Sequence, residues 1–168
     1  MPYISRQSVR EEAGFQHVEE NELPTGVIDG ANKVFMLEHK SIVDSNYSDN
    51  TDYVADVTAF IDGTPVTVSA VDARNSVITL ANAPASGVNL TVFYHHSQLS
   101  DTYIDGLIAE ATSILHRCLR GHGISTPLDN TEGSIYRDYY PTAQMIVRLY
   151  AAGLALTRDY GSSADRLS

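Results

Sequence analysis

The sequence predicts an α+β fold with a short N-terminal helix, a five-stranded antiparallel β-module and a C-terminal helical hairpin with an extended tail. Near both ends of the chain, apolar residues recur every three or four positions, which is the period of an amphipathic helix. Between these regions apolar and polar residues alternate and turn residues recur, as in half-buried strands. We expect four segments: an N-terminal helix and acidic connector at 1–24, the β-module at 25–99, the hairpin at 100–160 and the tail at 161–168.

The first predicted helix lies in YISRQSVREEAGF, and both of its ends carry capping signals. Ser5 is placed as the N-cap, Ile4 and Val9 occupy the two positions of a hydrophobic staple, and Gly14 stops the helix. A helix this short needs a partner surface, because isolated helices of fewer than about 12 residues are marginal. The next stretch, QHVEENELP, is expected to be an acidic connector that ends at Pro24.

Turn residues divide the central region into strands. Asp62-Gly63 stands between two alternating runs and is a strong hairpin signal. The stretches DGAN, DARN and ANAPASG separate the remaining runs. A polar stretch at 41–55 is expected to be a long exposed loop. The five strands are expected near 33–37, 56–61, 65–71, 76–80 and 88–95.

Two longer helices are predicted after the β-module, one over 101–121 and one from about Pro141 to Gly161. The first has aspartates in its first turn and arginines in its last turn, which matches the helix dipole. Its apolar stripe contains Ile104, Leu107, Ile108, Ala111, Ile114, Leu115, Cys118 and Leu119, with Cys118 expected to be a buried small hydrophobe. The predicted stripe of the second contains Ala143, Ile146, Val147, Tyr150, Leu154 and Thr157.

Composition and charge limit the classes of function. A chain of 168 residues with 43% apolar residues can bury its own core. Its single cysteine excludes an internal disulfide and suggests a reducing compartment. We expect no leader peptide and no contact with a membrane, because no apolar run approaches the roughly 18 residues of a membrane span.

The net charge of −10 is unevenly distributed along the chain. Residues 1–116 hold 16 acids and five bases, a balance of −11, whereas residues 117–168 hold five acids and six arginines, a balance of +1. So acidic a chain is not expected to bind nucleic acid by neutralising phosphates. An acidic wall does, however, let a polyanion slide past without sticking.

The metal-ligating residue types do not form a recognisable motif. His116 and Cys118 point about 200° apart on a helix, so neither they nor His122 are expected to share an ion. His95 and His96 are adjacent on a strand and should face opposite sides of the sheet. The stretch DSNYSDNTD resembles a calcium loop but lacks its central glycine and terminal glutamate. We expect no metal and no cofactor.

Catalytic motifs are also missing from the sequence. It contains neither G-x-S-x-G nor a phosphate-binding glycine loop, and GHGIS lacks the second flanking glycine of a nucleophile turn. Paired carboxylates such as Glu11-Glu12 and Glu19-Glu20 are adjacent, so they do not converge as an acid–base pair must. We therefore expect a non-enzyme. A small cytoplasmic enzyme whose catalytic residues meet only in the folded chain stays open as an alternative.

The order of the elements resembles tailed-bacteriophage structural proteins. The resemblance lies in MPYISRQSVREEAGF, TGVIDGANKVFML, VTAFIDGTPVTV, SVITLANAPASGVNLTVFY and DTYIDGLIAEATSIL. The β-module resembles a recurrent phage virion module, and the flanking helices resemble the head–tail connector or adaptor family of the phage neck. That family implies a ring, commonly twelvefold, beneath the portal. The partners implied are further copies of the chain, the portal protein, and the next neck, stopper or tail protein, with DNA passing through the lumen without sequence-specific binding.

The resemblance also implies contact residues and a location. The implied location is the head–tail junction of the virion, after synthesis in the host cytoplasm. Packing between subunits is expected at Ile104, Leu107, Ile108, Ile146 and Tyr150. Portal contact is expected at Tyr160, Gly161, Arg166, Leu167 and Ser168. Twelve copies at −10 each would total −120, so assembly of the ring is expected to depend on salt.

The β-module leaves two alternatives open, because proteins of this family are largely helical. One is a head-completion, head-decoration or tail-terminator protein. The other is a receptor- or carbohydrate-binding virion module, which would need exposed aromatic side chains on the β-module. The candidate set is Tyr47, Tyr53, Phe60, Phe93 and Tyr94.

Overall fold

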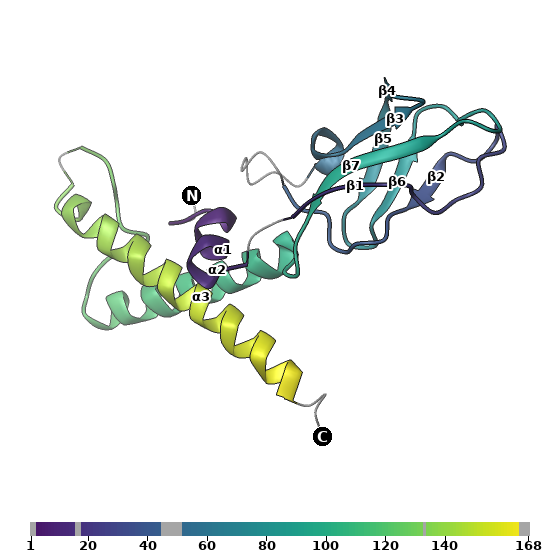
Figure 1. The fold of residues 1–168 in the computed structure, drawn as a ribbon. Helices are drawn as coiled ribbons and strands as arrows, with labels where there is room; N and C mark the ends of the chain where they lie inside the picture. Colours follow the sequence, from purple (N-terminus) through teal and green to yellow (C-terminus); the bar gives the residue numbers. More distant parts are fainter. Residues whose placement is uncertain (1–2, 16–17, 45–51, 133, 165–168) are drawn as a thin grey trace. The chain divides into compact units, whose positions relative to one another are not determined.

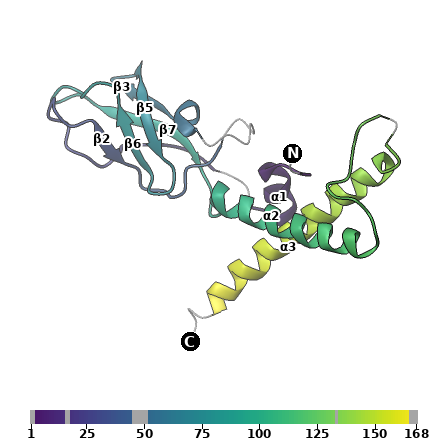
Figure 2. The same ribbon diagram turned by 180° about the vertical axis from the view of Figure 1, so that it is seen from behind.

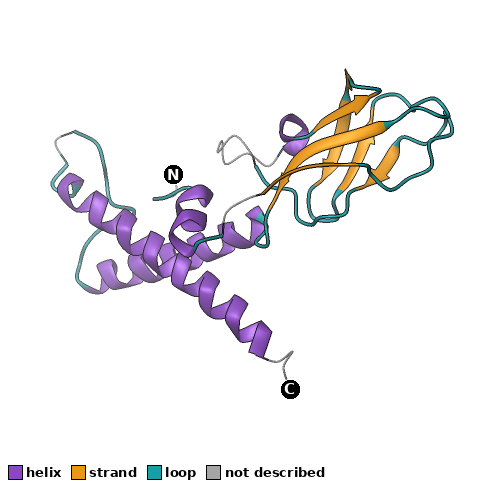
Figure 3. Ribbon diagram, in the orientation of Figure 1, coloured by secondary structure: helices purple, strands orange, loops and turns teal. Residues whose placement is uncertain are grey.

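The computed structural model in Figure 1 describes residues 3–15, 18–44, 52–132 and 134–164. The chain divides into two compact units. Residues 1–15 and 102–168 form one, called here the helical unit, and residues 16–101 form the other, called the β-unit. Helices and antiparallel sheets together give the α+β class that the sequence predicts (Figure 3).

The β-unit contains two antiparallel sheets. The four-stranded sheet has the order β1 (Val18–Glu22), β7 (Leu90–His96), β3 (Thr58–Ile61) and β4 (Thr64–Val66). The three-stranded sheet has the order β2 (Val34–Met36), β6 (Val77–Leu80) and β5 (Val68–Asp72). Buried side chains from both sheets and their loops form one core: Phe35, Leu37, Ile42, Val57, Ala59, Val68, Ile78, Leu80, Leu90, Val92 and Tyr94.

The predicted turns form where their residues indicate. Asp62 and Gly63 both have positive φ, at 48° and 79°, and join β3 to β4 as a two-residue hairpin. Such a loop requires positive φ at both central residues, which Asp-Gly supplies at little cost. Asp72 accepts the backbone N–H of Asn75 at 3.1 Å between β5 and β6. In the same way Asp29 accepts the backbone N–H groups of Ala31 and Asn32 in the turn before β2.

Two expectations about the strands are wrong. The run 65–71 does not form one strand, because β4 pairs with β3 in one sheet and β5 pairs with β6 in the other. The chain changes sheets at Thr67, whose carbonyl oxygen accepts the backbone N–H of Ala81 at 2.9 Å. The acidic stretch expected to be a connector forms strand β1 and pairs with β7 over its whole length. A short 3₁₀ helix, Tyr53–Asp56, precedes β3; it covers the end of the expected loop and Asp56, which was expected to begin a strand.

The helical unit contains α1 (Arg6–Ala13), most of α2 (Asp101–Gly121), a 3₁₀ turn (Arg137–Tyr139) and α3 (Tyr140–Ala164). The predicted caps of α1 are confirmed: the Ser5 side chain accepts the backbone N–H of Ser8, and Gly14 ends the helix with φ 76°. Helix α2 has the predicted bounds. Helix α3 continues to Ala164, beyond the predicted stop at Gly161.

Figures 1 and 2 show α2 and α3 crossing, with α1 against the crossing. The N-terminal segment is tied to both long helices and to the loop between them. The hydroxyl of the buried Tyr3 accepts the backbone N–H of Leu128 at 2.9 Å and lies 3.1 Å from Nε2 of His116 on α2. The Tyr3 carbonyl oxygen accepts a hydrogen bond from the Gln144 side chain of α3 at 2.7 Å. Buried Arg6 forms two 2.8 Å hydrogen bonds with the Asp105 carboxylate on α2.

We predict that Tyr3→Phe destabilises the helical unit by about 1–3 kcal/mol, because the buried N–H of Leu128 loses its acceptor. Urea unfolding followed by circular dichroism at a helical wavelength measures the change. Tyr139→Phe is the matched control, since Tyr139 is 64% exposed and its substitution should change the free energy of unfolding by less than about 0.5 kcal/mol. Equal effects of the two substitutions would contradict the role of the Tyr3 hydroxyl.

We also predict a pH dependence that involves His116. Burial lowers the pKa of His116, and the positive charge of Arg120 lowers it further. The unfolded chain therefore takes up this proton first, and the free energy of unfolding falls as pH drops below about 6.5 through the lowered pKa. His116→Gln should flatten the pH dependence of the free energy of unfolding between about pH 7.5 and 5.5. Arg120→Gln removes one cause of the lowered pKa, so it should narrow the pH range over which His116 changes that free energy. A profile unchanged by His116→Gln would contradict this account.

Candidate functional site

The structure separates the five residues expected to pack between subunits into two groups. Ile104, Leu107 and Ile108 of α2 are buried within this single chain. Their side chains contribute to the core of this chain, so they leave no surface for a neighbouring copy. Ile146 and Tyr150 of α3 are 43% and 44% exposed. These two are the predicted positions that remain available for contact with another subunit.

The buried face of α3 differs from the predicted stripe. The side chains that pack inward are mostly small: Ala143, Val147, Ala151, Ala152 and Ala155. Four larger apolar side chains of α3 are between 43% and 48% exposed. We call this set the α3 outer face: Met145, Ile146, Leu149 and Tyr150. Positions three and four apart lie together on a helix, so these four side chains form one continuous surface. Gly153 continues this face with open space around its Cα.

The residues expected to contact the portal lie at the end of the chain. Tyr160 and Gly161 fall in the last turns of α3, and only their backbone is described. Arg166, Leu167 and Ser168 lie outside the described residues. Among the residues that are described, no helix combines the length and apolar character that crossing a membrane requires.

Among the described residues, His116 and Cys118 of α2 and His122 just after it do not belong to a group of converging metal-ligand atoms. Nε2 of His116 is within hydrogen-bond distance of the Tyr3 hydroxyl, and the two rings pack edge-on with their centroids 5.6 Å apart. Cys118 is exposed, so the prediction of a buried thiol is wrong. The helix places its side chain on the solvent side of the buried stripe of α2. Of the stretch considered for calcium, residues 45–51 lie outside the described part of the chain.

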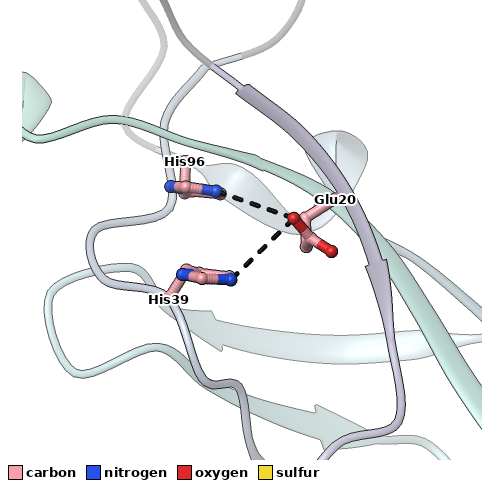
Figure 4. A group of neighbouring side chains, drawn as sticks. All are labelled: Glu20, His39 and His96. Atoms are coloured by element: carbon pink, nitrogen blue, oxygen red, sulfur yellow. Dashed lines mark ion pairs between the residues drawn. The ribbon is translucent and has the colours of Figure 1, made fainter.

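A cluster of histidine and glutamate side chains lies on one face of the β1–β7 pair (Figure 4). Glu20 stands opposite Tyr94 in the register, so His96, two residues further along β7, is its diagonal neighbour on the same face. The Glu20 carboxylate oxygen lies 4.0 Å from Nε2 of His96 and 3.8 Å from Nε2 of His39. The rings of His39 and His96 are stacked, with centroids 4.4 Å apart.

Backbone hydrogen bonds hold the His39 segment next to the end of β7. The N–H of Val43 donates to the carbonyl oxygen of His95 at 3.0 Å, and the N–H of Ser97 donates to that of Ser41 at 3.2 Å. The backbone N–H of His39 itself donates to the Tyr94 hydroxyl at 3.3 Å. The position of His39 beside His96 is therefore fixed by the fold of the β-unit.

Further carboxylates surround this cluster. Glu22, on the same face of β1 as Glu20, accepts the backbone N–H of Glu38 at 2.7 Å. Glu22, Glu38 and His39 form a second group of convergent donor atoms that shares His39 with the first. Burial raises the pKa of Tyr94, and the negative charges of Glu22 and Glu20 raise it further. Burial lowers the pKa of His96, as does the charge of His39, while Glu20 opposes the shift.

The sequence could not reveal this cluster. Its three residues are separated by 19 and 57 positions, and the segment that contains Glu20 has no alternation of apolar residues that would predict a strand. A weak signal existed in the spacing Glu20-x-Glu22, which places two carboxylates on one face of any strand. The expected alternation of His95 and His96 agrees with the register of β7, which places only His96 on the face of Glu20.

Comparison of the chain with protein-family models, with curated proteins and with solved structures found no match.

Proposed function

We propose that this chain is a structural protein of a tailed-bacteriophage virion, a head–tail connector or adaptor that assembles as a ring between the portal and the next neck or tail protein. Two observations support the proposal. The sequence resembles this class in the order of its elements, and the α3 outer face offers the kind of surface that ring subunits need. The proposed packing between copies depends on the exposure of the α3 outer face.

Four large apolar side chains form one exposed surface, and contiguous apolar surfaces of this kind often mark interaction sites. The occupant we propose is a second copy of this chain. Charge favours that choice, since residues 117–168, which contain α3, have a balance of only +1. Copies that meet there avoid the strong repulsion that contact between the acidic segments 1–116 would produce.

The β-unit supplies a second apolar surface for the proposed contact with the next neck protein. Val34 and Met36 point away from the core on β2, an edge strand of the three-stranded sheet, and each is more than half exposed. Phe35 between them is buried, as the alternation of a strand requires. In the assembled ring, the acidic surface of the remaining chain would line a conduit along which DNA slides without sequence-specific binding.

The alternative of a carbohydrate-binding module has less support. Such a site would need aromatic rings that are open to solvent. Tyr94 is fully buried, and Tyr53, Phe60 and Phe93 are each partly buried. Tyr47 lies outside the described residues. The exposed apolar side chains on α3 and β2 favour protein–protein contact.

We predict that Leu149→Glu disrupts self-association, because it places a charge in the centre of the proposed interface. Each buried leucine contributes roughly 1.5–3 kcal/mol, so the association constant should fall about tenfold or more per interface. Native mass spectrometry over a range of protein concentrations measures the distribution of oligomers. Ser113→Glu is the matched control, since it adds the same charge at an exposed position of α2 and should leave assembly unchanged.

Two outcomes of that experiment would count against the α3 outer face. One is a wild-type chain that stays monomeric at every concentration and also with the portal protein present. The other is a Leu149→Glu variant that assembles as the wild type does. Circular dichroism establishes that each variant is folded, because position 149 is exposed in the single chain.

We further predict that replacing residues 161–168 with a glycine–serine segment of equal length abolishes docking to the portal and leaves the subunit folded. The core of the helical unit lies before this segment: the last buried residue of α3 among those described is Ala155. Co-sedimentation with portal rings measures docking, and thermal unfolding reports the fold. Undiminished docking of the replaced chain would remove the role proposed for the C-terminal segment.

A further inference from the structure

We propose that Glu20, His39 and His96 form a binding site for one divalent transition-metal ion of the zinc type, with a water molecule as the fourth ligand. The site lies wholly within the β-unit and does not depend on the proposed function. The ion would fasten β1, an outer strand of the four-stranded sheet, to the segment that follows β2.

The first support is the convergence of donor atoms. Figure 4 shows both imidazole rings turned so that Nε2 faces the Glu20 carboxylate. The two nitrogen–oxygen distances are 3.8 and 4.0 Å, and the three donor atoms all lie within 4.8 Å of one another. Tetrahedral zinc with bonds of 2.0–2.1 Å places its ligand atoms about 3.3–3.4 Å apart. The two nitrogen–oxygen distances therefore need to shorten by about 0.4–0.7 Å for both imidazoles and the carboxylate to reach one ion.

The second support is the type of donor. Two neutral imidazoles and one carboxylate match the preferences of zinc, cobalt and related ions, and this ligand set occurs in zinc sites with one open position. Calcium and magnesium prefer oxygen ligands alone, so they should bind poorly here. The carboxylates of Glu22 and Glu38 lie close by and add negative charge that favours a cation.

The third support is that two of the ligands are held by strands while the third, His39, can still adjust its ring. His96 is fixed on β7, where its side chain is 16% exposed, and Glu20 is fixed by the pairing of β1 with β7. The rings of His39 and His96 are parallel to within 10°, so one ring must tilt before both lone pairs point at a single ion. His39 can make this adjustment, because it lies outside the strands and its side chain is 42% exposed. That exposure also gives water a route to the fourth position.

The site would strengthen the β1 edge of the four-stranded sheet. Strand β1 has the sequence VEENE, and its one apolar side chain, Val18, is 52% exposed, so the strand contributes little apolar surface to the core. Its hydrogen-bonded partner is β7 alone among the described strands. A metal ion that joins Glu20 to His39 adds a link between this edge and a neighbouring segment of the same unit. Such a link stabilises the folded state, because the unfolded chain does not hold the three ligands together.

The test titrates the full chain, purified without a histidine tag and freed of metal with a chelator, with Zn²⁺ in a calorimeter and with Co²⁺ in a spectrophotometer. We expect one Zn²⁺ per chain, a melting temperature that rises with Zn²⁺ concentration, and visible cobalt absorption typical of four-coordinate geometry. Mg²⁺ at the same concentration should produce neither heat nor a change in melting temperature.

Variants distinguish this site from adventitious binding. His39→Gln and Glu20→Gln should each weaken Zn²⁺ binding at least tenfold, and His39→Gln changes a part-exposed position that the fold tolerates. His122→Gln is the matched control, an exposed histidine of the helical unit that should leave binding unchanged. Glu38→Gln tests the neighbouring group and should have less than a threefold effect. Four results would overturn the proposal: no saturable binding, binding indifferent to both His39→Gln and Glu20→Gln, loss of binding in His122→Gln, or dependence on Glu38 in place of Glu20.

Discussion

The rotation of α3 about its own axis is set by the N-terminal segment of the chain. Three residues of α3, spaced four apart, each contact that segment: the Tyr140 ring packs on Tyr3, Gln144 donates to the Tyr3 carbonyl oxygen, and Arg148 lies 3.1 Å from the Glu12 carboxylate. Residues four apart lie on one face, so these contacts turn that face inward. The same segment is held on α2 by the ion pair of Arg6 with Asp105. The large apolar side chains of α3 are consequently left on the outside.

The orientation of α3 that the N-terminal segment sets bears directly on the proposed assembly. A helix with apolar residues on most of its circumference has no single orientation dictated by burial alone. Small buried residues such as Ala143 and Ala151 allow close packing of α3 within the helical unit, and Met145 and Leu149 remain exposed. The chain has its own core and a separate apolar surface, which is the arrangement that the proposed folding as a monomer followed by assembly would require.

Local signals in the sequence predicted the elements that depend on neighbouring residues. The caps Ser5 and Gly14, the hairpin at Asp62-Gly63 and the bounds of α2 all formed as expected, because each depends on a few adjacent side chains. Strand β1 was missed because its strand character comes from pairing with β7, distant in the sequence, and not from its own residues. The sequence did not predict that Glu20 and His96 converge, because that also depends on the pairing of β1 with β7. It did not predict which face of α3 is covered, because that depends on contacts with the distant Tyr3 and its neighbours.

Electron microscopy of the wild-type chain, alone and with the proposed portal partner, tests the ring proposal most directly. We predict closed rings in which the α3 outer face is buried against a neighbouring copy, with Leu149 and Tyr150 at the contact. Particles in which this face stays open to solvent, or a chain that never forms a ring in the presence of the portal, would contradict it.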